Sequence, residues 1–239
     1  MSFEHEVIRD RQFSEIALDN IRLVQRELLK IESEGIRWFT YNALLEVDSK
    51  YWIAAASSTG KHHPPEDNGE GGLVRHVIKG TLIVQELARR ARFSQRETDM
   101  AVSAFLLHDT CKDGVVWTKG RTDVTHGIIA AEWLASFELA DETAKTEIRN
   151  AIRYHMTPWC YAIDPFVDRS YTREEMQANI EELSRAMYPS RIEQVVRDAD
   201  YFASRENASF LPGRDIVFDA RKHDTPEEWL AELNSPYTV

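Results

Sequence analysis

Apolar residues recur every three or four positions along most of this chain, and this spacing constrains the fold more than any other sequence feature. Residues 13–33 show it clearly, because Ile21, Val24 and Leu28 are separated by charged side chains. A helix turns about 100° per residue, so such residues lie on one face. Only the segment DIVFDAR, residues 215–221, is a candidate for a short strand. We therefore predict an all-α protein.

Several helix starts carry the capping-box pattern, in which Ser or Thr is followed three residues later by Glu. The pattern occurs at Ser94 with Glu97, Thr172 with Glu175, and Thr225 with Glu228. Together with the apolar spacing it predicts helices over 13–33, 73–91, 95–109, 125–137, 142–156, 173–187, 190–206 and 226–233. The segment SSTGKHHPPEDNGEGG, residues 57–72, is rich in Gly, Pro and Ser and predicts a long loop between helices.

Composition narrows the class of protein. The 239-residue chain is long enough to bury its own core, and Cys111 and Cys160 are too few for a disulfide framework. No run of about 18 uncharged apolar residues occurs, so we expect a soluble, cytoplasmic protein without a membrane partner. The net charge of −11 argues against non-specific binding of duplex nucleic acid, which depends on clustered Lys and Arg. It does not exclude a nucleic-acid substrate.

Histidine and aspartate residues lie at the ends or on the faces of successive predicted helices: His76, His108, Asp109, His126, His155, and either Asp198 or Asp200. Imidazole and carboxylate groups bind divalent metals such as Mn²⁺, Fe²⁺, Co²⁺, Ni²⁺, Zn²⁺ and Mg²⁺. Neighbours on a helix diverge, so His108 and Asp109 can share an ion only beside a helix end. Gly80, one turn after His76, is compatible with the close approach of another backbone. Each residue alone is also explained as a core or surface group, so the prediction depends on their order and spacing together.

This ordered set resembles the HD-domain superfamily of metal-dependent phosphohydrolases over residues 57–206. The matching segments are GEGGLVRH before the first histidine helix, LLHDTCK for the His-Asp-x-x-Lys motif, and ADYFASR for the closing aspartate. The chain is similar to stand-alone HD proteins and to the HD portion of bacterial 3′-to-5′ exoribonucleases. The resemblance implies an HD-domain helical bundle over 57–206. Residues 1–56 are then expected to form an N-terminal helical extension packed on the core, and 207–239 a C-terminal extension with a short helix.

The resemblance also implies the metal ligands. One ion would be held by His76, His108, Asp109 and Asp200, and a second by His126 and His155 with Asp109 as the bridge. Helical periodicity does not distinguish Asp198 from Asp200, because the two lie about equally far on opposite sides of the apolar face of helix 190–206. Only the resemblance favours Asp200. One or two divalent ions are expected, of unassigned identity.

The function implied by the resemblance is a phosphohydrolase or phosphodiesterase that acts on a nucleotide or a nucleic-acid 3′ end through metal-activated water. Asp109 and Lys112 are the catalytic candidates, Lys112 for contact with a phosphate oxygen. A solvated lysine at a helix end is the alternative. The candidate substrate contacts are His63, Lys119, Arg121 and Arg205, which are also consistent with ordinary exposed side chains. No OB-fold is recognisable before residue 57, which favours a phosphorylated small molecule or short oligonucleotide over long RNA.

Two other functions are compatible with the same ligand set: an HD-type di-iron oxygenase, and a non-catalytic nucleotide-sensing HD module. Trp117, Trp159 and Tyr161 are candidates for stacking on a base, although such aromatic residues more often pack in a core. Cys111 is not predicted to be a nucleophile, because nothing near it in sequence activates a thiolate. The N-terminal helices either pack on the core or form the interface of a homo-oligomer.

Overall fold

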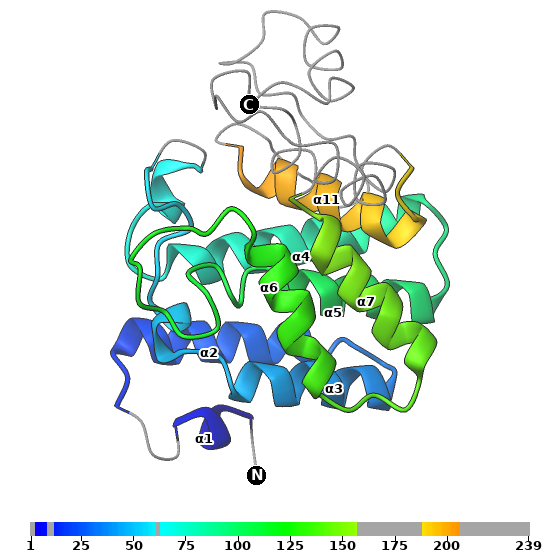
Figure 1. The fold of residues 1–239 in the computed structure, drawn as a ribbon, viewed down its shortest axis with the longest axis horizontal. Helices are drawn as coiled ribbons and strands as arrows, with labels where there is room; N and C mark the ends of the chain where they lie inside the picture. The colour runs from blue at the N-terminus through cyan, green and yellow to red at the C-terminus, as the bar shows by residue number, and fades with distance from the viewer. Residues whose placement is uncertain (1–2, 9–11, 61–62, 157–187, 206–239) are drawn as a thin grey trace, which may run out of the picture.

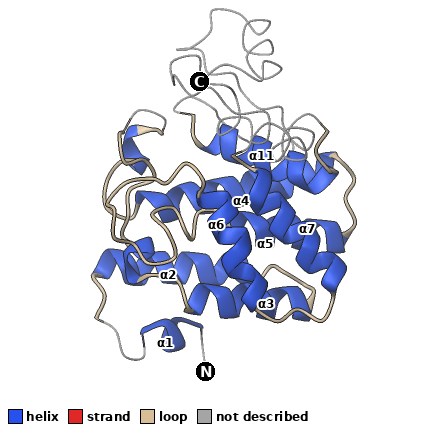
Figure 2. Ribbon diagram, in the orientation of Figure 1, coloured by secondary structure: helices blue, strands red, loops and turns tan. Residues whose placement is uncertain are grey.

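The computed structural model describes residues 3–8, 12–60, 63–156 and 188–205, and within them it contains helices and no β-sheet (Figures 1 and 2). The α-helices are α1 (Phe3–Ile8), α2 (Glu15–Leu28), α3 (Glu34–Leu45), α4 (Gly72–Arg90), α5 (Gln95–Leu107), α6 (His126–Trp133), α7 (Glu142–Tyr154) and α11 (Arg191–Ala203). Short 3-10 helices are η1 (Ser49–Trp52), η2 (Pro65–Asp67) and η3 (Leu134–Ser136). The predicted all-α class is confirmed. None of the described helices has the length and apolar character needed to cross a membrane.

Helix α5 is the central helix of the bundle. Every side chain from Asp99 to Leu107 is buried, and α5 contacts α2, α3, α4, α7 and α11. A helix covered on all sides is apolar around its circumference, which explains why the sequence AVSAFLL has no polar stripe. The predicted capping box at Ser94 and Glu97 is confirmed, because each side chain accepts a hydrogen bond from the other residue's backbone N–H.

The other helices pack around α5 in two groups. Helices α4 and α11 contact each other and α5, while α6 packs on α7, and α7 contacts α5 and α11. Figure 1 shows α1 to α3 on the side of α5 opposite α11. One continuous hydrophobic core extends from Phe3 in α1 to Ala203 in α11. The N-terminal helices therefore share a single core with the helices that follow.

The prediction of one helix over 13–33 is wrong in its last part. Helix α2 ends at Leu28, and a separate helix, α3, follows. The buried Asp99 on α5 accepts hydrogen bonds from the backbone N–H groups of Glu32, at 3.2 Å, and Ser33, at 2.7 Å. These bonds satisfy the donors of a chain that turns between two helices. Local periodicity does not reveal them, because the acceptor lies far away in the sequence.

The other predicted helices that fall on described residues are present; α4 is shifted by one residue, and the others are shorter than predicted. The ranges 73–91, 95–109, 142–156 and 190–206 correspond to α4, α5, α7 and α11, and 125–137 divides into α6 and η3. The described part of the predicted loop 57–72, which leaves out residues 61–62, contains η2 and no other helix before α4 begins at Gly72. A capping box at Ser190 and Glu193 begins α11, with the same spacing of Ser and Glu as at Ser94 and Glu97. Five predicted features lie outside the described residues: the helices 173–187 and 226–233, the capping boxes at Thr172 and Thr225, and the strand candidate 215–221.

Candidate metal centre

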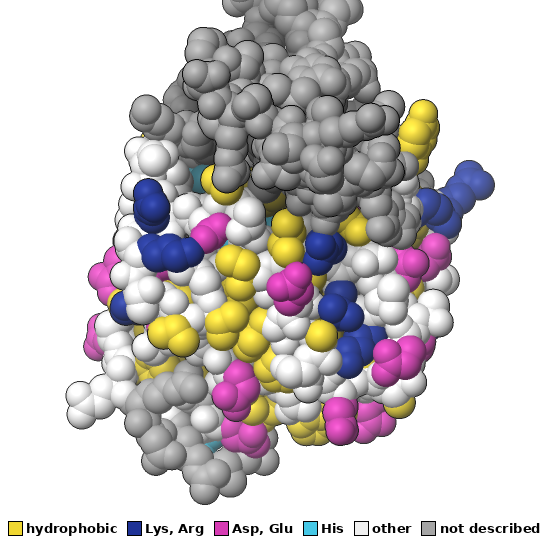
Figure 3. Space-filling view, viewed as in Figure 1, with side chains coloured by type: hydrophobic (Ala, Val, Ile, Leu, Met, Phe, Trp, Pro, Cys, Tyr) yellow, Lys and Arg dark blue, Asp and Glu magenta, His cyan; other side chains and the backbone are white. Residues whose placement is uncertain are grey.

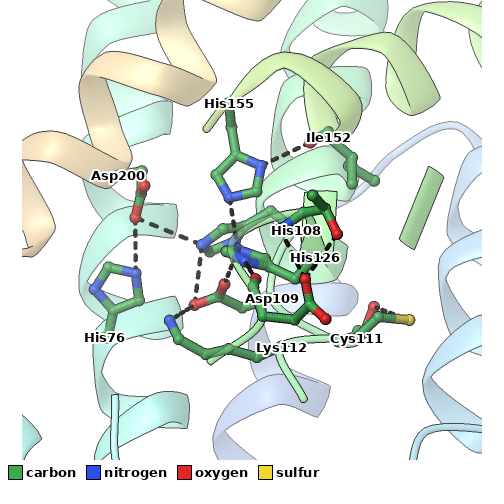
Figure 4. Close-up of polar contacts among 12 residues, drawn as sticks. His76, His108, Asp109, Cys111, Lys112, His126, Ile152, His155 and Asp200 are labelled. Carbon is green, nitrogen blue, oxygen red and sulfur yellow. Dashed lines mark hydrogen bonds and ion pairs between the residues drawn. The ribbon is translucent and has the colours of Figure 1, made fainter. Parts of the chain in front are cut away.

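Four histidines and two aspartates meet in the interior where α4, α5, α6, α7 and α11 converge (Figure 4). Their positions are His76 on α4, His108 and Asp109 at the end of α5, His126 at the start of α6, His155 after α7, and Asp200 on α11. The four imidazoles and Asp109 are at most 2 % exposed, and the Asp200 side chain is 15 % exposed. We call these six residues the ligand cluster. The fold thus gathers into one buried group the residues that the sequence predicted as ligands.

The first part of the ligand cluster consists of His76, His108 and Asp200, and we call it the α4–α11 half. Asp200 Oδ1 lies 3.0 Å from His76 Nε2 and 3.6 Å from His108 Nε2. Both Nε2 atoms are buried, and neither is in hydrogen-bond geometry with another described residue. Two imidazole nitrogens and a carboxylate oxygen therefore converge without satisfying one another.

The second part consists of His126 and His155, and we call it the α6–α7 half. The Nε2 atoms of the two rings are 3.1 Å apart. Asp109 lies between the halves, because its Oδ1 is 2.9 Å from His126 Nε2 and its Oδ2 is 3.5 Å from His108 Nε2. One carboxylate is consequently shared by both halves.

Three of the histidines are oriented by backbone carbonyl groups. In each, Nδ1 bonds the carbonyl oxygen three residues earlier: His108 to Phe105 at 2.7 Å, His126 to Asp123 at 2.7 Å, and His155 to Ile152 at 2.6 Å. His108 and His155 directly follow α5 and α7, where the last carbonyls have no partner within the helix. Since a carbonyl only accepts, Nδ1 carries the proton and Nε2 presents its lone pair to the cluster. Metal-binding histidines are held in this way.

The donor set fits divalent metal ions. Ligand atoms lie within 4.8 Å of one another in three overlapping groups: His76, His108 and Asp109; His108, His155 and Asp200; and Asp109, His126 and His155. A buried nitrogen without a partner is costly, so the orphaned Nε2 atoms of His76 and His108 favour a bound cation. Imidazole and carboxylate ligands suit the divalent ions of the first transition row. The cluster has the ligands for one or two such ions.

The two aspartates are ionised. Burial by itself would raise the pKa of Asp109, but Lys112 and His108 outweigh burial and hold that pKa well below its usual value. Burial also opposes ionisation of Asp200, and interactions with His108 and His76 lower its pKa well below the usual value. Both carboxylates therefore carry the charge that attracts a cation.

The histidines of the two halves differ in their electrostatic environment. Burial, followed by the neighbouring His108 and His126, lowers the pKa of His155 to about 3. Burial also opposes protonation of His108, but the carboxylates of Asp109 and Asp200 outweigh it and raise its pKa. The His155 ring is therefore neutral, whereas the carboxylates favour the charged form of His108.

Two glycines allow close packing beside the ligands. A Cβ atom at Gly80 would lie 2.0 Å from the Phe105 ring, whose centroid is 4.4 Å from that of His108. The sequence predicted a close backbone at Gly80, and the structure corrects this to an aromatic ring. A Cβ atom at Gly127 would lie 2.7 Å from the carbonyl oxygen of Ile152 and 3.0 Å from the His155 ring. The sequence analysis missed Gly127, although a glycine next to a predicted ligand is a visible signal.

Asp200 lies in the cluster, whereas Asp198 does not. Asp198 accepts hydrogen bonds from Gln194 Nε2, at 2.8 and 3.0 Å, within α11. Burial raises the pKa of Asp198, in contrast to Asp200. The geometry thus separates two residues that periodicity left equivalent.

The family model for the HD domain matches residues 73–205, which is more than half of the chain. The chain belongs to the HD-domain family. The matched segment of the HD domain contains all six residues of the ligand cluster. This family generally comprises metal-dependent hydrolases. No curated protein and no solved structure gives a significant match to the chain.

Two further candidates lie beside the ligand cluster of this HD domain. Lys112 Nζ is 2.6 Å from Asp109 Oδ2, and its side chain is 12 % exposed (Figure 4). The ring of His63 meets the ring of His76 edge to face, with centroids 4.7 Å apart. Burial, then His76 and Lys112, lowers the pKa of His63 to about 2, so this ring is neutral.

The other predicted substrate contacts lie farther out on the HD domain. Lys119 forms an ion pair with Asp123, whose carbonyl orients His126. Arg121 is exposed and makes no side-chain hydrogen bond or ion pair with another residue that the structure describes. Arg205 follows α11 and stacks on Tyr201, with Cζ 3.9 Å from the ring centroid.

Trp117 and Cys111, two residues near the His-Asp motif, are buried. Trp117 is buried, and its Nε1 donates to the carbonyl oxygen of Thr110 at 3.1 Å, so the stacking hypothesis is wrong for this residue. Trp159 and Tyr161 lie outside the described residues. Cys111 is buried, and burial raises its pKa to about 11, which disfavours a nucleophilic thiolate as the sequence analysis expected.

Proposed function

We propose that this HD protein is a divalent-metal-dependent phosphohydrolase or phosphodiesterase acting on the phosphate ester of a nucleotide or short oligonucleotide. The observation that carries the proposal is the buried ligand cluster with a lysine ammonium beside its shared carboxylate. A divalent ion bound there supplies two kinds of chemistry, since it lowers the pKa of water and neutralises phosphoryl charge. The family supports a metal-dependent hydrolase, and the substrate class is our inference.

The contribution of the chain is to hold the ligands in a fixed geometry. The carbonyls of Phe105, Asp123 and Ile152 orient three imidazoles before any substrate arrives. Such preorganisation avoids rearranging the ligands during the reaction. Ionised Asp109 holds the two halves together, because it faces His108 on one side and His126 on the other.

Positive charge for the substrate phosphate is supplied by Lys112 in this proposal. Its side chain is more exposed than that of Asp109, 12 % against 2 %, so the ammonium lies on the side of the pair that faces outward. A positioned ammonium stabilises the charge that develops on a phosphoryl oxygen. Neutral His63 is proposed to give a hydrogen bond rather than charge, and the proposed outer contacts are Lys119, Arg121 and Arg205.

The surface charge supports a small substrate over a long nucleic acid. The face seen in Figure 3 carries acidic and basic side chains interspersed with apolar ones, without one continuous basic area among the described residues. The whole chain has a net charge of −11. Long nucleic acids need clustered cations along their path, whereas a nucleotide needs only local ones.

A substrate panel tests the proposal. Purified protein is incubated anaerobically with Mn²⁺, Mg²⁺, Co²⁺, Ni²⁺ or Fe²⁺ and with nucleotides, cyclic dinucleotides, short oligonucleotides or generic phosphodiesters. We expect metal-dependent release of phosphate or cleavage of the diester, lost in Asp200→Asn and kept in Asp198→Asn, a matched change on the same helix. Activity that requires iron and oxygen identifies an oxygenase instead. Metal and nucleotide binding without turnover identifies a sensing module, and either result contradicts hydrolysis.

A further inference from the structure

His76 differs from the other three histidines in how its ring is surrounded. It lies within α4, where the carbonyl three residues earlier, that of Leu73, is taken by the helix's own hydrogen bond. The Nδ1 atom of His76 is buried and has no hydrogen-bond partner among the described residues. A group outside α4 must therefore orient this ring if it is to present Nε2 to a metal.

A buried carboxylate lies near the His76 ring, with a ligand atom within 4.8 Å of one of the ring nitrogens. Asp67 closes the 3-10 helix η2, and its side chain is 1 % exposed. Its Oδ2 accepts a hydrogen bond from Lys79 Nζ at 2.7 Å, while its Oδ1 is buried and has no hydrogen-bond partner among the residues that the structure describes. Lys79 also donates to the carbonyl oxygen of Ala203, at the end of the helix that carries Asp200. One oxygen of Asp67 is thus bonded to Lys79, and the other has no hydrogen bond to a described residue.

The backbone of Asp67 is fixed as well. Its carbonyl oxygen accepts the backbone N–H of Ala56 at 2.9 Å. A Cβ atom at Gly72 would lie 1.8 Å from the same oxygen, so the first residue of α4 must be glycine for this contact. The start of α4 and the turn before it are therefore locked together, which holds Asp67 at a set distance from the histidine helix.

The ligand atoms of His63, Asp67 and His76 lie within 4.8 Å of one another. Polar atoms that are this close but are not directly hydrogen-bonded can be joined by a single bridging water, which needs two or more polar partners. A further metal ion is disfavoured here, because Lys79 already neutralises Asp67. The group has the character of a hydrogen-bonded support for His76 rather than of another cation site.

We propose that Asp67 is a positioning residue for His76: its Oδ1 accepts the Nδ1 proton of His76 through one bridging water, which directs Nε2 toward Asp200 and the metal. Carboxylate groups behind metal-binding histidines have this effect. Asp67 precedes the matched family segment, residues 73–205. The inference rests on the metal centre of the proposed function but is independent of the hydrolytic reaction.

Calorimetric titration with Mn²⁺ tests the proposal. We expect Asp67→Asn and Asp67→Ala to raise the Kd of the ion at the α4–α11 half by about 10- to 100-fold, the usual effect of losing such a partner. In a His76→Ala background the same changes are expected to raise the Kd no further, because Asp67 affects metal binding only by orienting His76. Asp99→Asn is the matched control, since it alters a buried carboxylate whose hydrogen bonds go to Gln95 and to the turn between α2 and α3 rather than to the ligand cluster.

A second measurement separates positioning from simple destabilisation. In the Zn²⁺-loaded protein, we expect slowly exchanging Nδ1 proton signals in NMR spectra from all four histidines. Asp67→Ala removes the signal of His76 alone, because the other three are held by backbone carbonyls that the change leaves intact. Their persistence shows that the fold is preserved. The proposal is overturned if the Asp67 variants bind Mn²⁺ with an unchanged Kd, or if they weaken binding equally in the His76→Ala background. If the Asp67 variants show the expected effects but the wild-type protein has no hydrolytic turnover, only the proposed function is overturned.

Discussion

The two halves of the ligand cluster are built in different ways. The α4–α11 half uses His76 from the middle of a long helix and the carboxylate of Asp200, and its two Nε2 atoms have no hydrogen-bond partner in the described parts of the chain. The α6–α7 half uses histidines at helix ends, both oriented by carbonyls, with rings in mutual contact. The first half therefore has more charge to offer a cation, and the second has the more firmly oriented rings.

This difference suggests an order of binding. Asp200 lies 3.0 and 3.6 Å from the two imidazoles of the α4–α11 half, which also shares Asp109, whereas the α6–α7 half has Asp109 in contact and Asp200 only within 4.8 Å of His155. Attraction between opposite charges is strong in a buried environment, so the half with more carboxylate is expected to bind a cation first. Four predictions test this comparison.

The largest effect is expected for Asp109→Asn, because Asp109 touches both halves. Removing its charge weakens metal binding throughout the cluster and leaves Lys112 without its partner. We expect hydrolytic activity to fall by about 10³-fold, corresponding to the several kcal/mol that a metal contributes. Steady-state rates at saturating Mn²⁺ measure this, and a loss below about tenfold would show that Asp109 is not a shared ligand.

A smaller and asymmetric effect separates the halves. Asp200→Asn is expected to abolish the tighter Mn²⁺ binding step, whereas His155→Gln leaves that step and weakens any later one. The reason is that Asp200 belongs to the half with more negative charge. Calorimetric titration of both variants measures the steps. If His155→Gln removes the tight step and Asp200→Asn keeps it, the proposed order is reversed.

Packing changes test the same comparison through stability. Gly80→Ala places a Cβ atom against the Phe105 ring, which packs beside the α4–α11 half. Gly127→Ala places a Cβ atom against the carbonyl oxygen of Ile152, which orients His155 of the α6–α7 half. Overpacking of this kind lowers the free energy of unfolding by about 1–3 kcal/mol. Urea denaturation of the metal-free variants measures the loss. We expect only Gly80→Ala to weaken the tight Mn²⁺ step, and equal weakening by Gly127→Ala would show that the halves are not independent.

The smallest effect concerns pH in the metal-free protein. The pKa of His155 is lowered to about 3, so its contribution to stability is present above the unfolded value of about 6.5 and is lost as pH falls toward 3. His108 acts in the opposite direction: its pKa is raised, so its contribution is present below about 6.5 and is lost as pH rises through the raised value. NMR titration of labelled histidines follows both. Titration of His155 in the folded protein at pH 6 would contradict the assignment.

Much of this centre was predictable because its ligands lie within or directly beside regular helices, in an order that resembles the HD domain. The order of His76, His108, Asp109, His126 and His155 indicated the HD fold, and the structure brings these residues together. Asp200 was not separable from Asp198 by periodicity, since both flank the apolar face of α11. Only the packing of α11 against α4 directs one of them inward.

Other features depended on contacts between distant segments. The turn between α2 and α3 is held by Asp99, a residue of another helix, and the apolar periodicity of residues 13–33 does not reveal this contact. Asp67 lies in a loop whose composition predicted only irregular structure, and its relation to His76 appears when η2 packs against α4. Long-range hydrogen bonds of this kind are invisible to local pattern.

The central claim is that the buried ligand cluster holds divalent metal, and anomalous diffraction tests it most directly. Crystals grown with Mn²⁺ are measured on both sides of the manganese absorption edge, for the wild type and for Asp109→Asn. We predict an anomalous peak among His76, His108 and Asp200 in the wild type, and its loss or marked weakening in the variant. Manganese bound only elsewhere on the protein, with no peak inside the cluster, would contradict the account.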